Sequence, residues 1–337
     1  MPKKIERKTL TLSKIAKLYS DEEAAYLHLE SIRWSNGVVC PHCGSVNHSY
    51  LLNPQNGERI TRTGTKSYRR VWKCGECREQ FSVLVGTVME DSRIPLSKWL
   101  LAFHEMSADK NGISSHELAR KLDITQKSAW HLAHRIRYAS ERPPLSDKLQ
   151  GTVEADETYF GGKAKNMHKA KREREIQGRG TVGKTAVLAV VERGGEVRSQ
   201  VVENVNDATV RPILKANVDP QAILNTDTSP VYNQVGKEFA KHETVDHGKE
   251  EYVRGTAHIN TAEGHFSQLK RSIDGTHHHV SAKHLDRYLA EFDYRYTTRK
   301  QEDGLRTEEL IKRAVGKRLT YRKPIENSET LVKPSSD

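Results

Sequence analysis

Two segments that lie far apart in the chain each bring an aspartate to an apolar, strand-like run. Asp156 lies in the first run and Asp227 ends the second, while a third polar cluster, which contains Asn260 and Glu263, opens a helical pattern. Two strand-borne carboxylates and a third ligand on a helix are what a two-metal phosphoryl-transfer site requires. The pattern therefore predicts that these residues bind Mg²⁺ or Mn²⁺, with Asp156 and Asp227 as direct ligands, and support in-line displacement at phosphorus.

The residues alone leave the third ligand open. Glu263 lies in the first turn of the expected helix and Lys270 follows seven residues later, so both point to one helix face. A lysine beside a metal ligand suits contact with a phosphate. Asn260 lies at the helix start, where it is either an N-cap or a neutral oxygen ligand. Each acidic residue alone is more often solvated or ion-paired, so the prediction depends on the three positions together.

All four cysteines fall in two CxxC pairs, Cys40 with Cys43 and Cys74 with Cys77. Each pair places two thiolates on one tight turn, and two such turns complete a tetrahedral zinc site. The 30 residues between the pairs exceed the usual interval of a zinc ribbon, so a hairpin with an extended loop is expected. We therefore predict structural Zn²⁺ rather than two unrelated pairs or a redox motif.

Residues 111–130 fit a helix-turn-helix. Ser114 or Ser115 suits the N-cap of the first helix, and Thr125 suits that of the second, which is expected over 126–137. The candidates for reading bases in the major groove are Gln126, Lys127, His131, His134 and Arg135. A helical hairpin used only for packing or dimerisation is the alternative.

The charge balance points to a polyanionic partner. The 337 residues include 55 Lys and Arg against 44 Asp and Glu, a formal charge of +11. No apolar run approaches the roughly 18 residues of a membrane span, and the basic start lacks the apolar region of a secretory signal. These features predict a cytoplasmic protein without membrane contact, which joins the nucleoid when it binds DNA.

The order of patterns predicts an α/β chain of several domains. We expect an N-terminal helical segment (1–35), a zinc ribbon (36–90), a helix-turn-helix domain (91–145), a mixed-sheet domain (150–300) and a basic C-terminal tail (301–337). The paired prolines Pro143 and Pro144 mark the main boundary. Beyond them, a meander of three strands, a helix, a fourth strand and further helices follow the order of an RNase H-like fold. A basic loop over 163–179 is expected to be exposed.

Several motifs recur together in one known family. They are CPHC and CGEC, the helix-turn-helix that ends in HRIR, DETYFGGK from Asp156, NTD ending at Asp227, HINTAEG from His258, and GTHHHVS. Over roughly residues 20–300 the chain resembles bacterial insertion-sequence transposases related to eukaryotic Merlin elements. The resemblance implies cut-and-join transposition by an Asp-Asp-Glu-type domain acting on double-stranded DNA, at element ends and target, in a homodimer or larger assembly. Bacterial members can carry asparagine in place of the glutamate, with a lysine after it, so Asn260, Glu263 and Lys270 leave the third ligand open.

Other functions compete with transposition. A DNA-binding regulator derived from a transposase would need no acidic site, and a structure-selective nuclease would cut without joining. A recombinase with a tyrosine nucleophile is disfavoured, because no activating Arg-His set lies near Tyr159, Tyr232 or Tyr252. The histidines at 258, 265, 277–279 and 284 suit a second metal site or, more simply, a loop that contacts phosphate.

Overall fold

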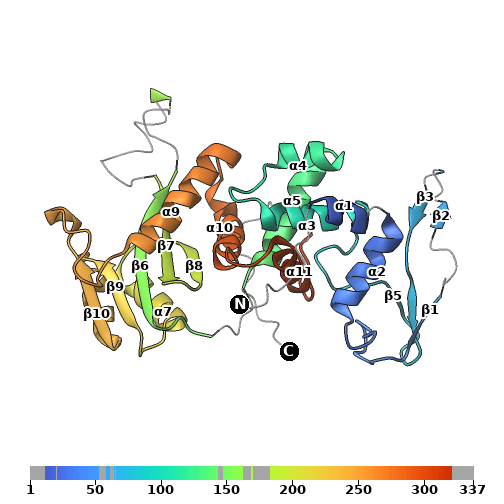
Figure 1. The fold of residues 1–337 in the computed structure, drawn as a ribbon, viewed down its shortest axis with the longest axis horizontal. Coiled ribbons are helices and arrows are strands. Elements are labelled where there is room, and N and C mark those ends of the chain that lie inside the picture. The colour runs from blue at the N-terminus through green and yellow to red at the C-terminus, as the bar shows by residue number, and fades with distance from the viewer. Residues whose placement is uncertain are drawn as a thin grey trace, which may run out of the picture. The chain divides into compact units, whose positions relative to one another are not determined.

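The computed structural model of the chain describes residues 12–19, 21–52, 58–60, 64, 66–142, 147–161, 168–169 and 183–320. The chain forms two compact units, of which the first combines Met1–Glu141 with Lys300–Asp337 and the second is Arg142–Arg299. Figure 1 shows the elements of both units. Pro143, Pro144 and most of the expected basic loop over 163–179 lie outside the described residues. Within the described ranges, no helix is long and apolar enough to cross a membrane.

The first unit begins with two helices and short antiparallel strands. These elements are α1 (Leu12–Leu18), α2 (Glu22–Arg33), β1 (Ser49–Leu51), β2 (Glu58–Ile60), β3 (Lys66–Tyr68), β4 (Trp72–Cys74) and β5 (Gln80–Phe81). Strands β1, β4 and β5 form one sheet in that order, while β2 and β3 pair with each other. The β2–β3 hairpin is the extended loop that the long interval between the CxxC pairs requires.

The rest of the first unit is helical. It contains α3 (Leu96–Ala108), α4 (Ser115–Leu122), α5 (Gln126–Ser140) and α11 (Asp303–Arg313). Helix α11 packs on α3, where the Thr307 hydroxyl lies 3.0 Å from His104 Nδ1 and 2.9 Å from the Ser107 hydroxyl. The sequence predicted only a basic tail from residue 301, but the structure shows helix α11 there. The chain returns to the first unit as a helix because Leu310 and Ile311 give α11 a buried face.

The second unit is built on one mixed sheet. Its elements are β6 (Thr152–Phe160), β7 (Thr185–Glu192), β8 (Val197–Val202), α7 (Asp207–Asn217), β9 (Ile223–Asp227), α8 (Tyr232–Val235), β10 (Lys241–Val245), α9 (Asn260–Ser272) and α10 (Ala282–Thr297). The strand order is β10-β9-β6-β7-β8, in which β6, β7 and β8 form an antiparallel meander and β9 and β10 run parallel to β6. This is RNase H-like topology, as the order of sequence patterns predicted.

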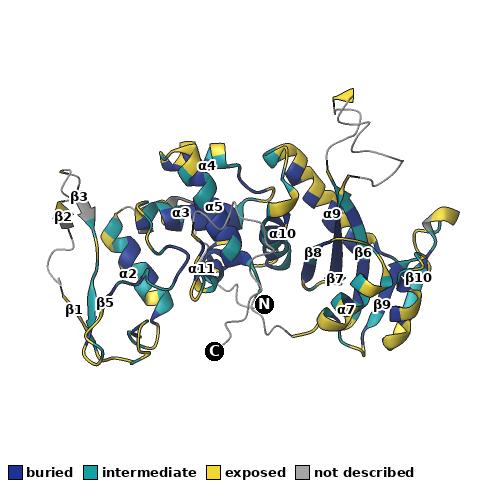
Figure 2. Ribbon diagram, turned by 180° about the vertical axis from the view of Figure 1, so that it is seen from behind, coloured by how far each residue is buried: buried dark blue, intermediate teal, exposed yellow. Residues whose placement is uncertain are grey.

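Strand β7 lies between two hydrophobic cores. Its residues Ala186, Leu188 and Val190 pack toward α7 and α8, while the alternate residues pack toward α9 and α10. Figure 2 shows the central strands in the colour of buried residues. Burial on both faces explains the nearly continuous apolar run of this segment, which a strand exposed on one side would not need. The two helical layers also fix where α9 lies relative to β6.

Candidate active site

Two parallel strands, β6 and β9, carry the two aspartates, with Asp156 in the middle of β6 and Asp227 as the last residue of β9. Their register pairs Glu154 with Asn225, which is the last pair that the two strands form, and Asp156 and Asp227 each lie two residues further on. Because strand side chains alternate, all four residues point to the same face. That face is the one under α9, since Glu154 accepts hydrogen bonds from the first turn of α9 while Ala155 belongs to the core under α7.

Carboxylates gather around Asp156. Burial raises the pKa of Asp156 to about 7, and the negative charges of Glu157, Asp227 and Glu263 add to this rise. The backbone N–H of Glu157 donates to Asp156 Oδ1 at 2.8 Å and opposes it. Asp227 Oδ1 accepts a hydrogen bond from the N–H of Ser229 at 3.0 Å. Like charges so close together repel, and a bound cation would offset that repulsion.

The first turn of α9 carries both residues that the sequence predicts as the third ligand. Asn260 is the first helical residue and is exposed, while Ile259 occupies the N-cap, so Asn260 is not the cap of this helix. Glu263 is partly buried and is one of the acidic neighbours that raise the pKa of Asp156. Lys270 lies exposed on the same helix. Because Asn260 is neutral, it can have no such effect, and this charge effect does not choose between the two candidates.

Glu157 points to the opposite face of β6. Its Oε2 accepts a hydrogen bond from the Tyr232 hydroxyl at 2.7 Å, and burial raises its pKa. Tyr232 itself is fully buried, and burial followed by the charge of Glu157 raises its pKa well above the usual value. This contact ties the segment after Asp227 to the strand that carries Asp156. A buried, hydrogen-bonded tyrosine with a raised pKa is also a poor nucleophile, which counts against the recombinase alternative.

The donor set fits divalent cations that prefer oxygen ligands. The Asn225 amide lies on the same strand face as Asp227, is 1% exposed and finds no hydrogen-bond partner among the described residues. An unpaired buried amide is costly, so an ion with its bound waters beside Asp227 would satisfy it. In the described part of the chain, only the four cysteines bring three or more Cys, His, Asp or Glu ligand atoms within 4.8 Å of one another. By this measure the described histidines form no metal cluster, and neither do Asp156, Asp227 and Glu263, whose carboxylate oxygens do not all lie within that distance of one another.

The four cysteines of the two CxxC pairs form a metal site of their own. The Sγ atoms of Cys40 and Cys77 lie 3.7 Å apart, and so do those of Cys43 and Cys74. Tetrahedral zinc with Zn–S bonds of about 2.3 Å places its sulfur ligands about 3.8 Å apart, so the cluster has the size that Zn²⁺ requires. All four positions of the tetrahedron are taken by protein, which leaves none for a substrate.

The helix-turn-helix follows the expected capping pattern. The Ser114 hydroxyl accepts from the N–H of Glu117 at the start of α4, and the Thr125 hydroxyl accepts from the N–H of Ser128 at the start of α5. Asp123 makes the turn in the left-handed region, at a φ of 49°. Short polar side chains at both N-caps satisfy helix N–H groups that have no partner within the helix.

The candidate base-reading residues divide by burial. Gln126 and Lys127 are exposed at the start of α5, and His131 is partly buried. His134 and Arg135 are 0% and 6% exposed. Arg135 donates to the carbonyl of Glu90 and its guanidinium lies 5.2 Å from the centre of the Trp99 ring. The prediction that Arg135 reads DNA therefore fails on packing grounds, because its side chain lies in the core.

Two residues near the acidic cluster were not assigned from the sequence. Glu154 is fully buried and lies two residues before Asp156. Arg193, the residue after β7, forms an ion pair with Glu154, in which Nε and Oε1 are 2.6 Å apart. The sequence does hold a signal for Glu154, because a charged residue inside an apolar strand is unusual. Arg193 has no comparable signal, because only the fold brings it to Glu154.

Comparison with known proteins agrees with this arrangement. Residues 148–297 match the ISXO2-like transposase domain, and residues 20–80 match a transposase zinc-ribbon domain. The chain is 31% identical to an uncharacterized protein in transposable element ISH50 of Halobacterium salinarum, over 82% of this chain and 90% of that protein. It is also 27% identical to an uncharacterized transposase-like protein of Haemophilus influenzae, over 30% of this chain and 80% of that protein. With a ribbon, an RNase H-like unit and relatives of this kind, the chain belongs to the ISXO2-like transposases of the IS1595 family.

Proposed function

We propose that this chain is a DNA transposase that binds the ends of its element and catalyses both strand cleavage and strand transfer. The observation that carries the proposal is the position of Asp156 and Asp227 on neighbouring strands of an RNase H-like sheet, where the charges of Asp227 and Glu263 add to the rise in the pKa of Asp156. Neighbouring carboxylates, one of which has a raised pKa, favour cation binding over a purely structural role.

Asp156 and Asp227 would hold Mg²⁺ or Mn²⁺, with Glu263 as the third protein ligand and Asn260 beside it. The bound ions would supply an activated oxygen nucleophile and stabilise the leaving oxygen at phosphorus. The exposed Lys270, two turns along α9, would contact the phosphate backbone and orient it for in-line attack. Water as nucleophile gives cleavage, and the 3′-hydroxyl that cleavage frees gives joining.

DNA recognition is proposed for the helix-turn-helix. Gln126 and Lys127 are exposed at the N-terminal end of α5, which is where a recognition helix meets base edges and phosphates. The domains proposed from the sequence then divide the work, with the ribbon and helix-turn-helix binding element ends and the sheet acting on them. Two ends must be brought together, so a homodimer or larger assembly on DNA is part of the proposal.

The test is an in vitro reaction on duplexes that carry the element's own ends, with Mg²⁺ and a plasmid target. We expect Asp227→Asn to lower cleavage and strand transfer by at least ~100-fold while end binding is kept. The matched control is Asp207→Asn, which changes a half-buried acid that pairs with Arg211 on α7, under the other face of the sheet. Binding without cleavage by the wild type would favour the regulator, and cleavage without joining would favour the nuclease.

A further inference from the structure

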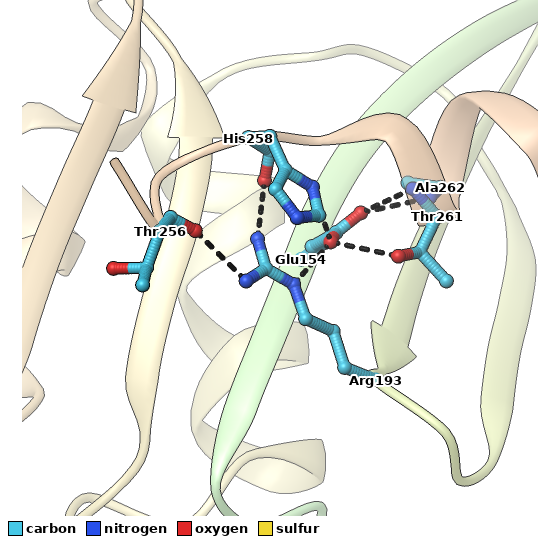
Figure 3. A network of polar contacts seen from close by, with 6 residues as sticks. All are labelled: Glu154, Arg193, Thr256, His258, Thr261 and Ala262. Atoms are coloured by element: carbon cyan, nitrogen blue, oxygen red, sulfur yellow. Dashed lines mark hydrogen bonds and ion pairs between the residues drawn. The ribbon is translucent and has the colours of Figure 1, made fainter. Parts of the chain in front are cut away.

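Glu154 is a buried carboxylate to which the proposed chemistry assigns no role. Its side chain is 0% exposed. Oε2 accepts from the backbone N–H groups of Thr261 (2.8 Å) and Ala262 (2.9 Å), and Oε1 accepts from the Thr261 hydroxyl (2.8 Å). His258 Nδ1 lies 3.2 Å from the same Oε1. Figure 3 shows these contacts converging on the carboxylate from the start of α9.

Arg193 completes the network from the other side. Its Nε donates to Glu154 at 2.6 Å, and its two terminal nitrogens donate to the carbonyls of Thr256 and His258, both at 2.8 Å. The guanidinium thus holds the chain segment that leads into α9 as well as the carboxylate that receives the helix (Figure 3). A planar fork with several fixed donors suits this task, and a lysine could not reproduce it.

The helix depends on this remote carboxylate for its cap. The N-cap position of α9 is Ile259, whose aliphatic side chain cannot accept a hydrogen bond. Glu154 accepts instead from the N–H groups of the second and third helical residues, and its negative charge lies at the positive end of the helix dipole. A strand residue therefore does what an N-cap side chain does in most helices.

The position of Glu154 connects this cap to the acidic site. Glu154 lies two residues before Asp156 on one face of β6, and Glu263 follows Ala262 directly in α9. One strand thus carries both a metal ligand and the group that anchors the helix bearing the third ligand. We propose that Glu154, supported by Arg193, is a positioning residue that sets the distance of Glu263 and Asn260 from Asp156. This inference rests on the proposed metal-dependent function of the site.

A buried ion pair that only stabilises the fold is the competing explanation. The two explanations differ in what happens to metal binding when the fold survives. Loss of a cap that sets helix position should weaken the binding of an ion held by both β6 and α9. Loss of general stability should lower the melting temperature without a specific effect on the ion. A matched control exists in the same unit, because Glu291 and Arg295 form another buried pair, at 2.8 Å within α10.

The experiment measures Mn²⁺ binding to the full chain by electron paramagnetic resonance, together with hydrogen exchange in α9. The variants are Glu154→Gln, Arg193→Lys, the control Glu291→Gln, and Asp227→Asn. For Glu154→Gln we expect the Kd for Mn²⁺ at the acidic site to rise ~10- to 100-fold, as for other residues that orient metal ligands. The amides of Thr261 and Ala262 should exchange faster, and strand transfer should recover in part at high Mn²⁺. Arg193→Lys should show the same effects more weakly, and Glu291→Gln neither.

The outcomes separate the inference from the function on which it rests. Unchanged Mn²⁺ affinity in both Glu154→Gln and Arg193→Lys, or an equal loss in Glu291→Gln, would overturn the positioning role. If Asp227→Asn binds Mn²⁺ as the wild type does, the proposed site itself is wrong. Should Glu154→Gln not fold, Arg193→Lys still decides, because it keeps the positive charge beside Glu154 and loses the fork to the two carbonyls.

Discussion

At the residue scale, Asp293 is a second carboxyl group with a strongly shifted pKa. It lies in α10 and accepts hydrogen bonds from the N–H (2.6 Å) and hydroxyl (2.8 Å) of Ser199, and burial raises its pKa to about 7. The hydroxyl of Ser199 also lies 3.1 Å from His265 Nε2, and burial lowers the pKa of His265 to about 4. The cluster joins β8, α9 and α10 and is most favourable when its members are uncharged.

Asp293 therefore makes a prediction about pH. The folded protein holds a proton on Asp293 between about pH 4 and pH 7 that the unfolded chain has lost, so its contribution to stability falls as pH rises through that window. We expect the unfolding free energy of the wild type, relative to Asp293→Asn, to fall over this range by a few kcal/mol at most, at roughly 1.4 kcal/mol per pKa unit. Urea titrations at pH 4.5 and 7.5 measure it. A constant difference between the two proteins would contradict the assignment.

Truncation of Arg135 should lower the stability of the protein, whereas truncation of Lys127 should weaken DNA binding. Arg135→Ala removes a core contact with Trp99 and leaves the carbonyl of Glu90 without its donor, so we expect a loss of ~2–4 kcal/mol in unfolding free energy. Lys127→Ala should leave stability within ~0.5 kcal/mol, because its side chain is exposed. It should weaken DNA binding and reduce the salt dependence by about one counterion. Thermal melts and binding titrations at several salt concentrations distinguish the two.

At the element scale, the zinc ribbon lacks the strand length to stand alone. Strands β1 and β4 have three residues each and β5 has two, well short of a self-supporting sheet. Metal ligation at the cysteines would supply the missing stability, as it does in other small zinc domains. The ribbon also meets α2, where Glu30 accepts from Arg70 Nε (3.0 Å) and Trp72 Nε1 (2.9 Å).

We expect Cys74→Ser to abolish stoichiometric zinc and to unfold the ribbon. Trp72 lies two residues away in β4, so its fluorescence should report the change, and DNA binding should weaken with it. Chelation of zinc from the wild type should have the same effect. The zinc content of each protein is measured by elemental mass spectrometry. A folded ribbon with unchanged DNA binding in the metal-free protein would refute the prediction.

At the scale of the whole molecule, the chain leaves the first unit near Glu141 and returns to it at Lys300. Helix α11 packs on α3, and further on Lys317 donates to the carbonyls of Tyr138 (3.1 Å), Ala139 (3.0 Å) and Glu141 (2.5 Å) at the end of α5. The C-terminal segment therefore closes the first unit and caps its longest described helix.

Truncation after Arg299 should accordingly destabilise the first unit and spare the second. We expect two calorimetric transitions, of which only the one assigned to the first unit shifts to lower temperature, by several degrees or more. Lys317→Met should shift the same transition less, because it removes the cap and keeps α11. A truncated protein with both transitions unchanged would show that α11 contributes nothing to the first unit.

Local patterns predicted much of the second unit. The apolar run of β7, the meander of three strands and the helix that follows it, observed as α7 (Asp207–Asn217), each follow from residues close in sequence. Strand β10 was not predicted, because Lys241–Val245 is an edge strand of mostly polar residues with little apolar signal. Helix α11 was also missed, since its many charged residues, three acidic and three basic, leave only a narrow buried face.

The sequence by itself determined the family, the zinc ligands and four of the five strands of the sheet, and it predicts Asp156 and Asp227 as a metal-binding pair. These features depend on residue types and short spacings, which can be recognised directly in the sequence. Only the tertiary structure decided that Arg135 is a core residue, that Glu263 acts on Asp156, and that Glu154 caps α9. Burial and contacts between residues about a hundred positions apart depend on how sheet and helices pack, and no local pattern records that packing.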